Sequence, residues 1–314
     1  MAQAAALTST VVYRDPKAAL DWLERAFDFE ITTLLTDAQG QVAHAEMGFH
    51  GVKIGVAGEW FGDMLGPATM KSPANLDGQG TQFCWIDLPE SLDIDAHCER
   101  ARAAGANITQ PPEEQFYGAR TYRALDPDGH VWNFRRHTRD VPAQEIEAAT
   151  GLTYAVEAPA PEARSPVTPY VCYADPAAAY AWLETAFGLE PRVYVTDGAG
   201  GLAHAEMAFR GQTLGVSKAW SDRHAVPGEV AGRNTQTIHL QLDADIDAHH
   251  ARAVAAGAQI IRPLETQAYG DRTYLALDLE GHVWSFGQTV KPMSMAEWDA
   301  RLGTTSQRRP PAAR

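Results

Sequence analysis

The decapeptide VAHAEMGFHG at residues 42–51 is followed 160 residues later by a close copy, LAHAEMAFRG at 202–211. The similarity extends upstream at the same spacing, since RDPKAALDWLERAFDFE (14–30) matches ADPAAAYAWLETAFGLE (174–190). Self-similarity over such a long period indicates that a whole domain has been duplicated. Both copies therefore report on one ancestral site.

The spacing of the repeat narrows towards the end of each copy. QFYGARTYRALDPDGHVWNF (115–134) and QAYGDRTYLALDLEGHVWSF (267–286) lie 152 residues apart, so the first copy carries eight additional residues before this point. Gly, Pro and Asn in FGDMLGPATMKSPANLDGQG mark the loop that holds them. From these boundaries we predict a first domain at 1–139, a linker at 140–166, a second domain at 167–290 and a tail at 291–314.

The composition argues against several classes of partner. A formal net charge of −14 is unfavourable for binding the phosphates of a nucleic acid. The chain has no apolar run long enough to span a bilayer and no signal-peptide pattern at its start, so we expect a cytoplasmic protein that does not bind membranes. Cys84, Cys98 and Cys172 do not recur between the halves and lack CxxC spacing, which favours reduced structural thiols.

Each half contains the same order of local patterns twice. A β-rich run leads into Asp15 and Pro16, which suit the N-cap and the first residue of an amphipathic helix. Three β-rich runs follow. The formula then recurs with DIDAHCERARAAGA as its helix, in which we expect Asp95 to be the cap and His97, like His249 in the second half, to face solvent. The chain is therefore predicted to hold four βαβββ modules.

These modules and their motifs resemble the glyoxalase/bleomycin-resistance/extradiol-dioxygenase superfamily, the vicinal oxygen chelate proteins. The motifs are DPxxAxxWLExAF, HAEM, DIDAHxxRAxAAGA and YGxRTYxALDxxGHVW, and they are most similar to the PhnB-like branch. The resemblance covers about 1–138 and 166–290. It implies an α+β fold of two tandem glyoxalase-like domains, in which curved mixed β-sheets enclose cavities and the helices lie outside. Function must still be argued from the site.

Metal-dependent members of that superfamily hold one divalent ion with ligands from four strands. In the first half of this chain the four positions fall at Thr8, Gly55, Thr81 or Gln82, and Asn133. In the second half they fall at Thr168, Gly215, Thr235 or Gln236, and Ser285. None of these side chains is a strong metal ligand, so we expect neither a metal site nor a cofactor. The candidate ligand-binding residues among them are Gln82, Gln236, Asn133 and Ser285.

The HAEM strand supplies the candidates for catalysis. Side chains alternate across a strand, so His44 and Glu46 share one face while Ala45 lies on the other, and His204 with Glu206 repeats the pattern. If the apolar face covers the helices, each polar pair faces a cavity. A His and a carboxylate there can act as acid and base or bind a polar ligand. The alternative is that each pair is structural and bonds only to its neighbours.

Two further groups recur in both halves as candidate ligand-binding residues: Tyr117, Arg120, Tyr269 and Arg272 at the YG turns, and Trp60 and Trp220 after the fourth strands. A planar guanidinium at the turn can bind a carboxylate or phosphate. A structural bond from Arg120 to Asp126 or to loop carbonyls is the alternative. The tryptophan rings can stack on a flat ligand or pack in the core.

Three functions fit these observations. The first is a metal-free protein, resembling the bleomycin-resistance members, that binds a small aromatic or cationic molecule in its cavity. The second is a metal-independent isomerase or lyase with Glu46 or Glu206 as the base and a histidine as its acid partner. The third is a metal-dependent lyase or dioxygenase with atypical ligands. The sequence leaves open the identity of the ligand, whether a reaction is catalysed and whether both halves are active.

The duplication also predicts how the chain assembles and where it is cut. Four modules can pair as two single-domain copies would in a homodimer, so a monomer with an internal pseudo-dimer is sufficient, and a homodimer is the alternative.

Limited proteolysis should cut first inside 140–166, a segment rich in Ala, Pro and Glu. Mass spectrometry of the fragments checks this. First cleavage inside 42–56 or 202–216 would contradict the module boundaries.

Overall fold

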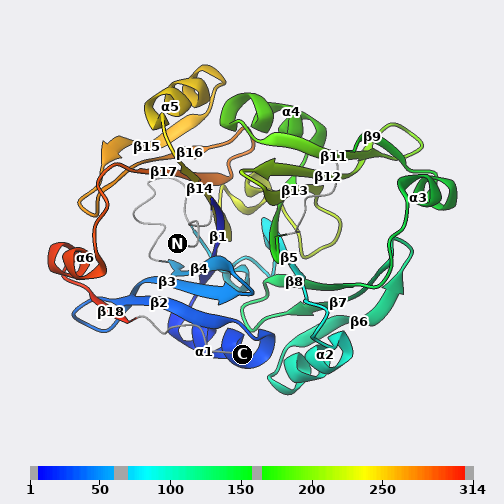
Figure 1. The fold of residues 1–314 in the computed structure, drawn as a ribbon, viewed down its shortest axis with the longest axis horizontal. Coiled ribbons are helices and arrows are strands. Elements are labelled where there is room, and N and C mark those ends of the chain that lie inside the picture. Colours follow the sequence, from blue (N-terminus) through cyan, green and yellow to red (C-terminus); the bar gives the residue numbers. More distant parts are fainter. Residues whose placement is uncertain (1–5, 60–69, 158–164, 308–314) are drawn as a thin grey trace.

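The computed structural model describes residues 6–59, 70–157 and 165–307, and the chain forms four βαβββ modules there, as predicted (Figure 1). The first consists of β1 (Leu7–Tyr13), α1 (Pro16–Phe27), β2 (Glu30–Thr36), β3 (Val42–Phe49) and β4 (Val52–Gly58). The second consists of β5 (Gln82–Asp87), α2 (Ile94–Ala103), β6 (Asn107–Gln115), β7 (Ala119–Leu125) and β8 (Val131–His137). The third consists of β10 (Val167–Tyr173), α4 (Pro176–Phe187), β11 (Glu190–Thr196), β12 (Leu202–Phe209) and β13 (Gln212–Lys218). The fourth consists of β14 (Gln236–Leu242), α5 (Ile246–Ala255), β15 (Gln259–Thr266), β16 (Asp271–Leu277) and β17 (Val283–Thr289).

The linker and the tail extend this pattern. The linker contains α3 (Ala143–Thr150) and β9 (Thr153–Glu157), and the tail contains α6 (Met295–Leu302) and β18 (Thr305–Gln307). β9 pairs with β11, and β18 pairs with β2. The linker predicted at 140–166 therefore contributes a strand, β9, to the edge of a sheet.

The modules combine into two nine-stranded mixed sheets, each built from both halves of the chain. Sheet A has the order β15-β16-β17-β14-β1-β4-β3-β2-β18, and sheet B has the order β6-β7-β8-β5-β10-β13-β12-β11-β9. Sheet A thus joins the first and fourth modules, and sheet B joins the second and third. At the centre of each sheet two first strands run antiparallel, β1 with β14 and β10 with β5. The two copies of the repeat are interleaved in space.

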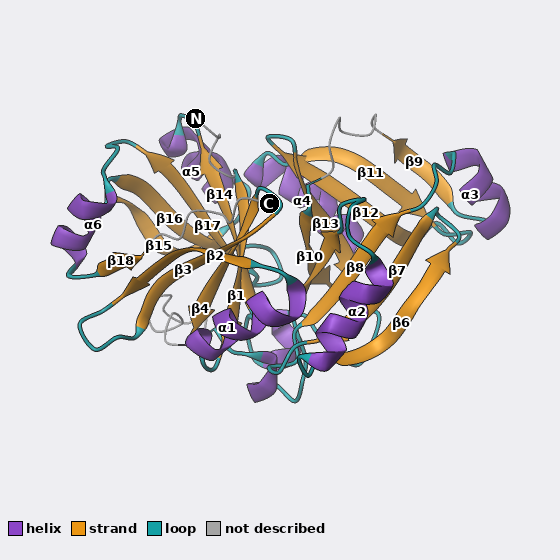
Figure 2. Ribbon diagram, turned by 60° about the horizontal axis from the view of Figure 1, so that its bottom comes forward, coloured by secondary structure: helices purple, strands orange, loops and turns teal. Residues whose placement is uncertain are grey.

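The module helices lie outside the sheets, which curve away from them (Figures 1 and 2). Helix α1 begins at Pro16, where Asp15 accepts a hydrogen bond from the backbone of Ala18, as the sequence predicts for this cap. Its apolar stripe, which includes Phe27, packs in one core with Met47 of β3. We call the helix-covered side of each sheet its outer face and the concave side its inner face. None of the helices in the described ranges has the length and apolar character of a membrane span.

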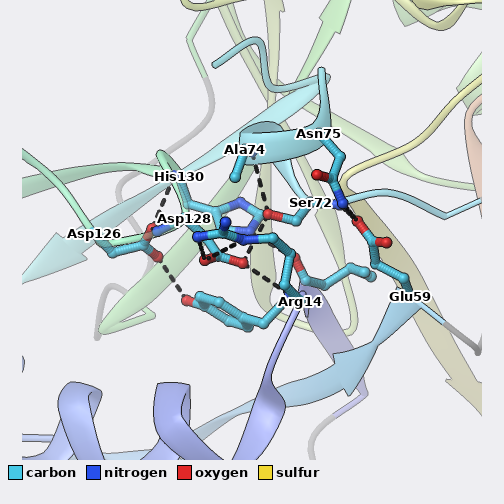
Figure 3. A network of polar contacts seen from close by, with 10 residues as sticks. Arg14, Glu59, Ser72, Ala74, Asn75, Asp126, Asp128 and His130 are labelled. Carbon is cyan, nitrogen blue, oxygen red and sulfur yellow. Dashed lines mark hydrogen bonds and ion pairs between the residues drawn. The ribbon is translucent and has the colours of Figure 1, made fainter. Parts of the chain in front are cut away.

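A buried aspartate ties each half together across the two sheets (Figure 3). Asp126, in the turn after β7 of sheet B, accepts hydrogen bonds from the hydroxyl of Tyr13 on β1 of sheet A (2.7 Å) and from the indole of Trp132 (3.0 Å). The neighbouring Asp128 binds the side chain and backbone of Arg14. Asp278 repeats the Asp126 arrangement with the equivalent Tyr and Trp of the second half.

Reciprocal hydrogen bonds join the sheets at their centre. The amide nitrogen of Gln82 donates to the backbone oxygen of Gln236 (3.0 Å), and Gln236 returns the bond (3.3 Å). The backbone nitrogens of Thr81 and Thr235 likewise donate to each other's hydroxyls. This exchange has the symmetry expected of a two-fold interface within one chain.

His97 and His249 are buried, so the expectation that they face solvent is wrong. Helix α2 is capped by Asp93 rather than Asp95. Nδ1 of His97 lies 2.6 Å from the hydroxyl of Tyr122, and Nε2 lies 3.4 Å from a backbone carbonyl at the end of α1. His249 has the same partners in the second half. Burial lowers the pKa of each histidine to about 4.

These two histidines should make stability depend on pH between about 6.5 and 4. Their pKa is near 6.5 in the unfolded chain and about 4 in the folded one. The unfolded state therefore binds more protons in this window, and the free energy of unfolding falls as the pH drops, by at most about 3 kcal/mol per histidine.

Urea unfolding at pH 7, 6, 5 and 4 measures this loss. The variants His97→Gln and His249→Gln, and the two combined, should flatten the pH dependence although they lower stability at pH 7. An unchanged slope in the double variant would contradict the assignment.

Candidate functional site

The HAEM strand β3 places its polar side chains on the inner face of sheet A. Ala45 and Met47 are buried in the core beneath α1, so His44 and Glu46 lie on the opposite side of the strand. This is the alternation that the sequence predicts. β12 repeats this alternation on sheet B, where Ala205 and Met207 pack in the core under α4.

Glu46 is bonded from three strands. Its carboxylate lies 2.7 Å from Nζ of Lys53 on β4, accepts a hydrogen bond of 3.0 Å from the hydroxyl of Thr33 on β2, and lies 3.7 Å from Nε2 of His44. Burial raises the pKa of Glu46, but the hydrogen bonds and charges of His44 and Lys53 outweigh that effect and hold this pKa far below its ordinary value. Glu46 is therefore an anion at neutral pH.

The equivalent Glu206 of β12 has different neighbours, because Thr213 stands in place of the lysine. Nε2 of His204 lies 3.2 Å from Oε1 of Glu206, and the hydroxyl of Tyr170 donates to the same oxygen at 3.0 Å. The ring of Tyr170 lies against Gly215, where any Cβ would collide with it. Burial, followed by the charge of Glu206, raises the pKa of Tyr170 and keeps its hydroxyl a neutral donor.

The two inner faces differ in side-chain volume at equivalent positions of the central strands. Sheet A has Thr10, Thr237, His239 and Gly287 where sheet B has Tyr170, Phe83, Trp85 and Arg135. On sheet B the large groups pack together, with the rings of Phe83 and Tyr170 stacked at 5.1 Å. Arg135 forms an ion pair with Asp87 at 2.6 Å and lies over the ring of Trp85. The described side chains on the central strands are therefore smaller beside Glu46 than beside Glu206.

An apolar cluster lies on the same inner face of sheet A. Its buried members are Val12, Met70, Leu275 and Val283. Leu275 of β16 is paired with Ser285 of β17, and the hydroxyl of Ser285 contacts His239. The inner face of sheet A thus presents a polar region and an apolar region side by side.

His239 of β14 is a site residue that the sequence analysis missed. It is paired with Thr8 of β1 and with Ser285 of β17, whereas the expected position on this strand was Thr235 or Gln236. Nδ1 of His239 lies 3.0 Å from the hydroxyl of Ser285, and Nε2 lies 2.9 Å from Oε1 of Gln241. Burial lowers the pKa of His239, so its ring is neutral at pH 7.

The described residues around His239 offer few metal ligands. His239 is paired with Thr8 and Ser285, and hydrogen bonds engage both of its ring nitrogens. Among the residues that the structure describes, no three His, Cys, Asp or Glu side chains gather as metal ligands would. Protein metal sites of this kind need at least three such donors.

The arginines of the YG turns lie on the outer faces. Arg120 binds Asp95 of α2 through two hydrogen bonds of 2.9 and 2.7 Å. Arg272 binds Asp247 of α5 in the same way. Both guanidinium groups therefore anchor a helix to a sheet. The alternative that Arg120 bonds to Asp126 is therefore wrong, and ligand binding by Arg120 and Arg272 stays a prediction.

The aromatic candidates are distributed between the two sheets. Tyr117 of the first YG turn is partly buried near Arg123 and Arg135, and burial raises its pKa. Tyr269 of the second packs on the tryptophan of α6 with ring centroids 5.6 Å apart. Trp220 is 44% exposed and lies over the guanidinium of Arg123. Trp60 lies outside the described residues.

The four amide and hydroxyl candidates also separate. Asn133 and Ser285 lie on the inner faces, where Oδ1 of Asn133 accepts a hydrogen bond from Arg123 (2.8 Å) and Ser285 contacts His239. Gln82 and Gln236 instead bond to each other's backbones between the sheets. These two glutamines thus lie at the junction of the sheets, and ligand binding by them stays a prediction.

Comparison with known proteins agrees with this architecture. The family model of the Glyoxalase/Bleomycin resistance protein/Dioxygenase superfamily matches residues 6–134 and 166–286. The chain belongs to this superfamily. The narrower PhnB-like assignment stays a prediction.

Several relatives are similar over different parts of the chain. An uncharacterized protein of Mycobacterium tuberculosis (strain H37Rv) is 32% identical over 142 residues, which is 44% of this chain and 82% of that protein. Glyoxalase I from Zea mays has a TM-score of 0.57 at 12% identity and covers 94% of both chains. A putative dioxygenase from Bacillus subtilis has a TM-score of 0.51 at 13% identity and covers 93% of this chain and 88% of that one. At these identities the two solved structures show the fold alone.

We predict that the purified protein contains no stoichiometric transition metal, because His239 is paired with a threonine and a serine and no three metal-ligating side chains gather in the described part of the chain. Elemental analysis for Zn, Ni, Mn and Fe should give well under one ion per chain. One ion per chain in the wild type that disappears in His239→Ala would contradict this.

Proposed function

We propose that this chain binds a small organic molecule on the inner face of sheet A without the help of a metal ion. The observation that carries the proposal is the room beside Glu46, where small side chains replace the bulky ones that cover Glu206. Ligand sites are concave and mostly apolar, with a few converging polar groups. The inner face of sheet A has this composition.

The polar groups indicate what the ligand must carry. Glu46 is an ionised acceptor, Lys53 is a donor and His44 is half-exposed beside them. A hydroxyl, amide or ammonium group can bond to this set, while an apolar or aromatic body packs near Leu275 and Val283. These requirements describe the small aromatic or cationic molecule that the sequence suggested.

The same geometry weighs against proton transfer by the His44 and Glu46 pair. A general base works best when its pKa lies near the working pH. The pKa of Glu46 is far below that range because His44 and Lys53 outweigh the effect of burial. Binding is therefore favoured over an isomerase or lyase reaction at this site.

The test compares two matched variants of the full-length chain, Glu46→Gln and Glu206→Gln. Native mass spectrometry for a co-purified molecule, followed by a thermal-shift screen of small molecules, identifies a ligand. Loss of one charged hydrogen-bond acceptor should then weaken its binding by about 1–3 kcal/mol in Glu46→Gln, or roughly 5- to 150-fold. We expect Glu206→Gln to change the affinity by less than twofold.

Thermal unfolding of both variants serves as the control for folding. An equal loss in the two variants would place the ligand elsewhere. An unchanged affinity in Glu46→Gln, with the fold intact, would show that this carboxylate is structural.

A further inference from the structure

Arg123 of β7 is a partly buried cation on the inner face of sheet B. Its Nε donates to Asn133 at 2.8 Å, and its guanidinium carbon lies 4.2 Å from the ring centroid of Trp220. In the described part of the chain no Asp or Glu forms an ion pair with it, whereas Arg135 on the next strand binds both oxygens of Asp87. The outer N–H groups of Arg123 are therefore available for a bond.

The partial burial of Arg123 disfavours its charged form. Arg123 is partly buried, and burial lowers its pKa, although the nearby Tyr117 and Glu113 act in the opposite direction. A partly desolvated charge gains most from an anion that replaces the lost water. A planar guanidinium is suited to a carboxylate, to which it can donate two parallel hydrogen bonds.

A second unsatisfied group lies next to it. His224 is only 4% exposed, and its Nδ1 bonds to the hydroxyl of Ser221 at 2.8 Å. Its Nε2 is buried without a hydrogen-bond partner among the described residues. The ring of His224 lies 4.3 Å from that of Trp220 and 4.9 Å from that of Phe83. Buried polar atoms are usually paired, so an orphan here points to a ligand atom.

The duplication shows that the fold does not require this cluster. The position of Arg123 is occupied in sheet A by Leu275, which packs in the apolar cluster, and the position of Phe83 by Thr237. Two copies of one architecture therefore exist with and without the cation. Because one copy folds without this arginine, ligand binding explains Arg123 better than a role in folding does.

We propose that Arg123, Trp220 and His224 form a second binding site, on the inner face of sheet B, which takes a planar aromatic carboxylate. The carboxylate accepts hydrogen bonds from the guanidinium of Arg123 and from Nε2 of His224. The aromatic body contacts Trp220, which is 44% exposed and packs on the buried ring of Phe83. This site differs in charge from the one on sheet A and does not depend on it.

The experiment uses three probes of one shape, 2-naphthoate, neutral 2-naphthamide and cationic 2-naphthylmethylammonium. Their affinities for the full-length chain are measured by calorimetry and by tryptophan emission. In the wild type the carboxylate should bind at least tenfold more tightly than the amide. In Glu46→Gln, which removes the carboxylate proposed to bind cations on sheet A, the cation should bind most weakly. In Arg123→Leu, which installs the residue found at this position in sheet A, the preference for the carboxylate should disappear.

Three further variants locate the effect. Arg123→Lys should retain part of the preference, because lysine keeps the charge but cannot donate two parallel hydrogen bonds to a carboxylate. Trp220→Phe should reduce the emission change on binding. Glu46→Gln should leave the affinity for naphthoate unchanged, which separates this site from the one proposed on sheet A.

Several results would overturn the proposal. Equal affinities for naphthoate and naphthamide in the wild type would do so, as would a preference that persists in Arg123→Leu. If Arg123→Leu fails to fold, an undiminished preference in both Arg123→Lys and His224→Gln decides against it. Loss of naphthoate binding in Glu46→Gln alone would assign the anion to sheet A.

Discussion

The structure depends on two buried carboxylates that fix the sheets against each other. Asp126 and Asp278 each accept hydrogen bonds from a tyrosine hydroxyl and an indole nitrogen, with donor–acceptor distances of 2.7 to 3.0 Å. In each case the tyrosine ends the first strand of one sheet, and the aspartate lies in a turn of the other. This constraint fixes the position of both inner faces, since β1 and β10 end at these tyrosines and β5 and β14 begin at the threonine and glutamine exchange between the sheets.

Much of the fold could be predicted because local patterns repeat and have local physical causes. Asp15 and Pro16 define a helix start, and alternation in the HAEM strand predicts which side chains face the helices. His97 was misjudged because its burial depends on Tyr122, which lies 25 residues further along the chain. Helical position alone does not reveal such a partner.

The candidate site could be predicted only in part, because the sequence of one strand does not determine its register with a strand far away in the chain. His44 and Glu46 lie on one strand, and their face follows from its alternation. His239 reaches the same face only through the pairing of β1 with β14, more than 200 residues apart, where Thr8 is opposite His239. Arg123 could not be predicted for a different reason, because the duplication points to residues shared by the two halves and Leu275 replaces Arg123 in the second half.

The outermost strands have a consequence for the behaviour of the chain in solution. A sheet edge with free N–H and C=O groups can recruit a strand from another molecule. Here two edges are formed by very short strands, β9 and β18, which the linker and the tail contribute. The other two edges, β6 and β15, contain Pro111, Pro112 and Pro263, which have no N–H to donate. The edges of the two described sheets thus discourage the addition of a strand from another molecule.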